Sequence, residues 1–142
     1  MDFDGTIAEF AWPKCGPPRE NVIEALRRLR GEGWRIIIHT SRANTDGLLA
    51  ERQRRIGEMI AFLGEHEVPV NEVWGLSLYG MEWGADFFAR GKPIAHFYLD
   101  DRGLLDIDTL TADHIVLIAL RRFVEVEAQY AKSLAENRAA DV

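Results

Sequence analysis

The sequence predicts an α/β fold: a single domain with a doubly wound, Rossmann-like, mostly parallel sheet flanked by helices. Short apolar runs alternate along the chain with amphipathic segments of helical period, as in parallel strands joined by crossover helices. Two of these runs, residues 34–39 and 95–99, are rich in β-branched or aromatic residues and are followed at once by polar residues. Strands buried on both faces of a parallel sheet have this pattern.

The expected elements follow from apolar periodicity and from glycine and proline positions. Helices are expected at residues 21–30, 45–63 and 111–136, and strands at 34–39, 68–74 and 95–99. Residues 8–19, rich in proline and glycine, predict a loop, and residues 75–91 show no clear period. Only Met1 precedes Asp2, so the strand that should end at Asp2 is expected to be truncated, since strands usually have five or six residues.

Length and composition narrow the class of protein. The 142 residues, 47% of them hydrophobic, suit one domain spanning 1–142. The net charge of −6 argues against a nucleic-acid-binding surface. No apolar run reaches about 18 residues and no signal peptide is evident, so no membrane association is expected. The single cysteine, Cys15, allows no internal disulfide, and a cytoplasmic location is the simplest expectation.

The stretch from Asp2 to Ile7 places two carboxylates, Asp2 and Asp4, one residue apart. If Asp2 ends a strand, both acids face the space above the sheet, where they repel each other unless a cation neutralises them. Asp-Gly is also a common turn dipeptide, so this stretch alone is equally consistent with a surface turn.

Three polar clusters follow expected strands: Asp2 with Asp4, Thr40 with Ser41 and Arg42, and Asp100 with Asp101. Ligands of doubly wound sheets bind beyond the carboxyl ends of the strands. Together with Lys92, these clusters would form a hard oxygen site for Mg²⁺ and a phosphate-binding site. Other interpretations remain: Asp100-Asp101 as a solvated turn, Lys92 as a plain loop lysine, and Arg42 equally as a phosphate ligand or as half of a structural salt bridge.

This combination resembles the haloacid dehalogenase-like (HAD) superfamily of phosphatases. Residues 2–6 match its Asp-x-Asp-Gly-Thr motif, and residues 36–40 match the apolar strand that ends in Thr or Ser. Lys92 stands where that family has its lysine, and residues 98–101 match the apolar strand that ends in an acidic pair.

The resemblance implies a magnesium-dependent phosphomonoester hydrolase that acts through an aspartyl-phosphate intermediate. Asp2 would be the nucleophile, and Asp4 would protonate the leaving oxygen and then activate water. The resemblance implies that Thr40 and Lys92 bind the phosphate; Ser41 is the alternative to Thr40, and Arg42 is a further candidate. The implied metal ligands are Asp2, Asp4 through its main-chain carbonyl, Asp100 and Asp101.

The resemblance also bears on the substrate. The intervals from Asp4 to Thr40 and from Thr40 to Lys92 are too short for a cap domain, so a capless, open site is expected. An open site suits a phosphate exposed on a larger molecule, or closure by a second subunit in a homo-oligomer through the C-terminal helix or residues 79–88. A small phosphorylated metabolite fits equally well.

Two other classes stay open. One is a catalytically inactive HAD-like domain used for binding or assembly. The other is a phospho-acceptor signalling domain, which the order of the motifs disfavours because that class has its acidic pair early in the chain.

Overall fold

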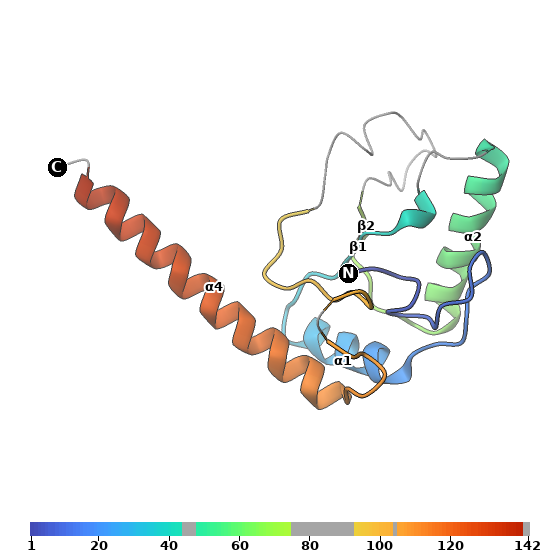
Figure 1. The fold of residues 1–142 in the computed structure, drawn as a ribbon, viewed down its shortest axis with the longest axis horizontal. Coiled ribbons are helices and arrows are strands. Elements are labelled where there is room, and N and C mark those ends of the chain that lie inside the picture. Colours follow the sequence, from blue (N-terminus) through green and yellow to red (C-terminus); the bar gives the residue numbers. More distant parts are fainter. Residues whose placement is uncertain (44–47, 75–92, 104, 141–142) are drawn as a thin grey trace.

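The computed structural model describes residues 1–43, 48–74, 93–103 and 105–140 (Figure 1). The described elements are α1 (Glu20–Gly31), β1 (Ile37–Ile38), the 3₁₀ helix η1 (Ser41–Ala43), α2 (Leu49–Glu65), β2 (Glu72–Val73) and α4 (Ala112–Ala140). The helices expected at 21–30, 45–63 and 111–136 therefore correspond to α1, α2 and α4. The aromatic residues 79–88 lie outside the described part of the chain.

The strands are shorter than expected. β1 and β2 are parallel, with Ile37 opposite Glu72. Ahead of β2, the Asn71 side chain occupies the ladder position at Ile36, where its Oδ1 accepts the Ile36 N–H at 2.8 Å. Pro69 has no N–H to donate, and the Val70 N–H donates back to Val68 instead. The Asn71 main-chain N–H also donates to the Ile36 carbonyl at 2.9 Å, and the regular ladder follows with Ile37 opposite Glu72 and Ile38 opposite Val73.

Met1 and Asp2 lie beside β1 and bond on both sides. The Met1 amino group donates to the Ile37 carbonyl at 2.8 Å, and the His39 N–H donates to the Met1 carbonyl at 2.7 Å. On the other side, the Asp2 N–H donates to the Leu99 carbonyl at 3.1 Å. Extended backbone thus lies in the spatial order β2, β1, residues 1–2 and Leu99. Residues 95–99 form no regular strand, and the doubly wound sheet remains a prediction.

The core is formed where α1 and α2 meet this backbone. Phe3 is fully buried, and its ring meets that of Phe62 on α2 edge to face, with centroids 5.2 Å apart. The inward face of α1 supplies Val22, Ile23, Ala25, Leu26 and Leu29.

The first part of α4 packs against α1, where Ile115 and Ala119 are buried. Farther along α4, the Phe123 ring packs against Trp34 and His96, with centroids 5.7 and 4.8 Å apart, and Glu127 bonds to His96 at 2.8 Å. The C-terminal part of the 29-residue helix extends away from the other elements (Figure 1). Among the described helices, none combines the length and apolar character needed to cross a membrane.

Removing the Phe3 ring should lower the free energy of unfolding by about 3–5 kcal/mol, because the Phe3→Ala change leaves a cavity against Phe62. Urea denaturation measures this loss. The matched control is Phe10→Ala: Phe10 is 63% exposed, so its loss should stay within about 0.5 kcal/mol. Equal losses in both variants would contradict this account of the core.

Candidate functional site

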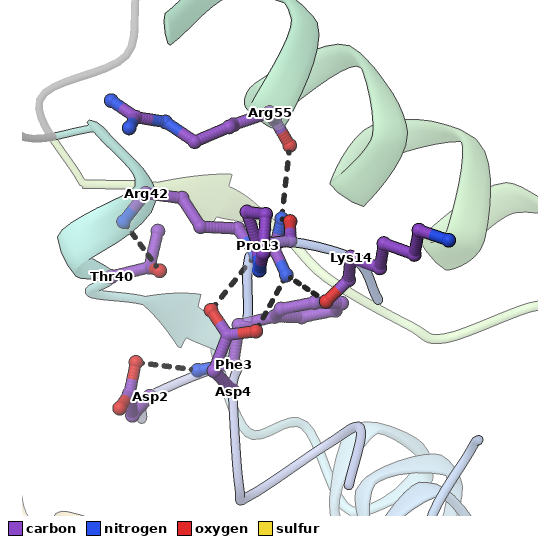
Figure 2. Close-up of polar contacts among 8 residues, drawn as sticks. All are labelled: Asp2, Phe3, Asp4, Pro13, Lys14, Thr40, Arg42 and Arg55. Atoms are coloured by element: carbon purple, nitrogen blue, oxygen red, sulfur yellow. Dashed lines mark hydrogen bonds and ion pairs between the residues drawn. The ribbon is translucent and has the colours of Figure 1, made fainter. Parts of the chain in front are cut away.

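The chain turns sharply after Asp2, and that turn separates the two acids of the motif. The Phe3 carbonyl accepts the Ile7 N–H at 2.9 Å, and Gly5 has a φ of +80°, a conformation that favours glycine. The buried Phe3 and Ile7 side chains anchor the turn to the core. The carboxylates of Asp2 and Asp4 consequently have different surroundings, and the Asp2 carboxylate lies away from the partners of Asp4 (Figure 2).

Asp2 lies in a cluster with Asp100 and Asp101. One carboxylate oxygen of each residue lies within 4.8 Å of the others. Asp2 and Asp100 also border a small hollow of about 10 Å³, close to the volume that one water needs. The structure thus brings together three of the four acids expected to bind a metal.

Two residues of the motif hold Asp101 in this cluster. The Thr6 hydroxyl accepts the Asp101 N–H at 3.0 Å. Gly5 lies so close to Asp101 that a Cβ at position 5 would stand 2.1 Å from its Oδ2. Neither residue is among the site residues expected from the sequence, although both belong to the Asp-x-Asp-Gly-Thr motif.

Burial and neighbouring carboxylates raise the pKa of two of the acids in this cluster, Asp2 and Asp101. Burial raises the pKa of Asp2 to about 6; the hydrogen bond from the Phe3 N–H opposes this rise, and the neighbouring charge of Asp100 contributes to it. Burial also raises the pKa of Asp101, and so does Asp100 through a hydrogen bond and its charge. The three carboxylates offer hard oxygen ligands, and a divalent cation would remove the penalty of ionising Asp2 and Asp101.

The carboxylate of Asp4 has a different partner. Arg42 Nε donates to Asp4 Oδ2 at 2.8 Å, and Arg42 Nη2 donates to Asp4 Oδ1 at 2.6 Å, a two-point ion pair (Figure 2). The Arg42 side chain is fully buried and Asp4 almost so. The carboxylate of Asp4 is therefore not part of the acidic cluster, and metal binding through its main-chain carbonyl stays a prediction.

Arg42 uses its remaining donors on the main chain. They reach the carbonyls of Pro13 (3.1 Å), Lys14 (2.8 Å) and, more weakly, Arg55 on α2 (3.5 Å). Each of the five guanidinium N–H groups thus has an acceptor. Of the two roles that the sequence left open for Arg42, the structure shows the salt bridge. A phosphate-binding role would need donors that Arg42 has already used.

The other expected phosphate ligands differ in how exposed they are, and one of them lies outside the described residues. Thr40 is buried at the end of β1, where its Oγ1 accepts the Arg42 N–H at 3.2 Å. Ser41 is exposed at the start of η1. Lys92 lies outside the described residues. The phosphate-binding roles of Thr40, Ser41 and Lys92 stay predictions.

Comparisons with known proteins leave the family open. No family model matches the chain, and no curated protein matches it. Among solved structures, a crystal structure of a Vibrio cholerae protein with no named function shows 25% sequence identity. The match covers 85% of this chain and 94% of that chain. Its TM-score of 0.46 is too low to support an argument about fold or function.

Changing Gly5 to Ala should cost more stability than the same change at Gly33. Both glycines have positive φ, +80° and +88°, so both variants lose about 1 kcal/mol to backbone strain. Only at Gly5 does the new methyl group meet Asp101, whereas nothing lies within 4 Å of a Cβ at Gly33. Chemical denaturation of both variants should show an additional loss of about 1–3 kcal/mol for Gly5→Ala. Equal losses would mean that the contact with Asp101 has no energetic weight.

The Asp2→Asn variant should be more stable than the parent protein at about pH 7.5 without divalent cations. The pKa of Asp2 is raised from 3.8 to about 6 in the folded protein. The contribution of the protonated carboxyl to folding stability is therefore fully present below pH 3.8, and it is lost as pH rises through about 6 and the buried group ionises. Because Asp2 is only partly buried, we expect a difference of about 1–2 kcal/mol at neutral pH. Thermal denaturation across pH measures it, and a constant difference down to about pH 4 would contradict the raised pKa.

Proposed function

We propose that this protein is a magnesium-dependent phosphomonoester hydrolase of the HAD type, with Asp2 as its nucleophile. The observation that supports this proposal most is the cluster of Asp2, Asp100 and Asp101, in which two pKa values are raised. Perturbed carboxylates gathered beside a hollow are typical of functional sites. The resemblance of residues 2–6 and 98–101 to HAD motifs gives this cluster a chemistry.

The proposed reaction has two steps. An oxygen of Asp2 attacks phosphorus while the bond from phosphorus to the ester oxygen breaks, and Asp4, which must carry a proton before this step, gives it to the leaving oxygen, so that the alcohol departs. Water then attacks the aspartyl phosphate and gives its proton to Asp4, so that inorganic phosphate leaves and Asp2 is restored. Mg²⁺, held by Asp2, Asp100 and Asp101, would offset the repulsion between carboxylate and phosphate.

The ion pair with Arg42 bears on the role of Asp4. Both oxygens of Asp4 accept hydrogen bonds from the guanidinium, and Asp4 is not one of the three acids that cluster at Asp2. Proton transfer by Asp4 would require one of these bonds to open during the reaction. This requirement is specific to the geometry of the chain and is not part of the sequence resemblance.

The same ion pair favours the second candidate, a catalytically inactive HAD-like domain used for binding or assembly. An aspartate held by a buried arginine with no donors to spare suits a structural role. The two candidates differ in one measurable property, the turnover of a phosphate ester.

The substrate we propose is a phosphomonoester, either a small metabolite or an exposed phosphate on a larger molecule. The short intervals between the motifs leave no room for a cap domain. A second copy of the chain is the other means of closing such an open site.

Hydrolysis of p-nitrophenyl phosphate with Mg²⁺ tests the proposal. The Asp2→Asn variant should lose at least about 10³-fold in kcat, because it removes the nucleophile while keeping its shape. The control is Asp106→Asn, a change at an exposed acid outside the cluster, which should keep full activity. Full activity in Asp2→Asn would refute the mechanism.

Absence of turnover in the parent protein would favour the inactive domain. In that case, Mg²⁺ should still raise the melting temperature of the parent more than that of Asp2→Asn if the acidic cluster binds metal. Equal shifts in both proteins would remove the metal site as well.

A further inference from the structure

The position of the Asp4 carboxylate limits what it can contact. Its two oxygens accept hydrogen bonds from Arg42, at 2.8 Å from Nε and 2.6 Å from Nη2. Only 6% of the Asp4 side chain is exposed, and none of the Arg42 side chain is. Figure 2 shows the Asp4 oxygens directed at Arg42, whereas the Asp2 carboxylate lies apart from this pair. While the pair is closed, a leaving group at Asp2 therefore cannot reach an oxygen of Asp4, in either protonation state.

Arg42 is held in place by further contacts. Its other N–H groups donate to the main-chain carbonyls of Pro13, Lys14 and Arg55. Its guanidinium also lies over the Phe3 ring, 5.2 Å from the centroid. Opening the pair would leave a buried charge without its counter-charge, which proteins tolerate poorly. We therefore expect the pair to stay closed during a reaction at Asp2.

The other acidic groups near Asp2 are also not placed to protonate a leaving group. Asp100 and Asp101 are the proposed metal ligands, and a carboxyl group must be deprotonated to bind a metal. His39 and Tyr98 line the hollow that Asp2 borders, and its volume of about 10 Å³ holds about one water but no leaving group. Among the described residues, none is thus placed to give a proton to a leaving oxygen at Asp2.

The need for such a proton depends on the substrate. An alkoxide is about as strong a base as hydroxide, so an alkyl phosphate reacts slowly unless an acid protonates the leaving oxygen. A carboxylate is a weak base, with a pKa of about 4 for its acid, and departs without a proton. When the nucleophile is also a carboxylate, as in Asp2, one anhydride of a carboxylic acid and phosphate replaces another.

We propose that the substrate of this site is an acyl phosphate, the mixed anhydride of a carboxylic acid and phosphoric acid, and that alkyl phosphates react poorly. The proposal rests on the proposed function, because it needs Asp2 as the nucleophile. It names the substrate class of that same site, and it follows from the closed ion pair between Asp4 and Arg42.

The reaction balances without Asp4. An oxygen of Asp2 forms a bond to phosphorus while the bond from phosphorus to the acyl oxygen breaks, and that electron pair leaves with the carboxylate. Water then attacks the phosphorus of the aspartyl phosphate, and the electron pair of the breaking bond returns to the Asp2 carboxylate. Both protons of the water remain on the released phosphate, which then equilibrates with the solvent.

Benzoyl phosphate and benzyl phosphate test the proposal, because they share a ring and differ in the leaving group, a carboxylate or an alkoxide. With Mg²⁺, kcat/KM for benzoyl phosphate should exceed that for benzyl phosphate by at least about 10³-fold, since no acid assists the alkoxide. The Asp2→Asn variant should lose the turnover of benzoyl phosphate above the uncatalysed rate. Values of kcat/KM within about tenfold of each other would overturn the proposal and leave the proposed function intact. Turnover of neither substrate would refute the proposed function itself.

The Asp4→Asn variant gives a second readout, the ratio of kcat/KM for p-nitrophenyl phosphate to that for phenyl phosphate. Both values come from one protein sample, so any loss of folded protein cancels in the ratio. If Asp4 transfers no proton, the ratio should stay within about threefold of that of the parent protein. A rise of about tenfold or more would overturn the proposal, because the more basic phenolate would then have depended on a proton from Asp4.

Discussion

The buried ion pair between Asp4 and Arg42 joins parts of the chain that lie far apart in sequence. Asp4 belongs to the N-terminal motif, Arg42 to η1, and the other acceptors of the guanidinium lie in the loop at Pro13 and Lys14 and on α2. Removing one partner of such a pair costs about 3–5 kcal/mol, because the remaining charge stays buried. The guanidinium also lies 5.2 Å from the Phe3 ring centroid and 5.4 Å from that of Trp12. The Arg42 side chain therefore holds together the N-terminal motif, the loop at residues 12–14 and α2.

This pair gives the two acids of the motif opposite electrostatic settings. Asp4 has its charge matched at both oxygens, whereas Asp2 faces two further carboxylates, and its pKa rises to about 6. A pair of groups whose environments differ in this way can divide the work of a reaction between them. Asp2 is the acid without a cationic partner among the contacts described above. It is also the acid that would bind metal and attack phosphorus in the proposed reaction.

The backbone of Met1 and Asp2 connects the acidic cluster to a groove. Asp2 borders the small hollow beside Asp100, and Met1 borders the groove between residues 34–37 and 94–97. Main-chain hydrogen bonds join these two residues to Ile37 and His39 on one side and to Leu99 on the other. A nucleophile needs a rigid support. The position of Asp2 therefore depends on a short segment of backbone, residues 1–2, that also borders the groove.

The sequence by itself determined the local features: the helices at α1, α2 and α4, the loop before α1 and the acidic residues of the site. These features depend on the spacing of apolar residues and on the chemistry of each residue, and both can be read from a short stretch of sequence. Only the tertiary structure decided that Asp4 faces Arg42 rather than Asp100, and that Gly5 and Thr6 hold Asp101. It also limited β1 and β2 to two residues each, because Asn71 caps the ladder with its side chain. These outcomes depend on long-range packing and on competition among hydrogen-bond partners, which no local pattern encodes.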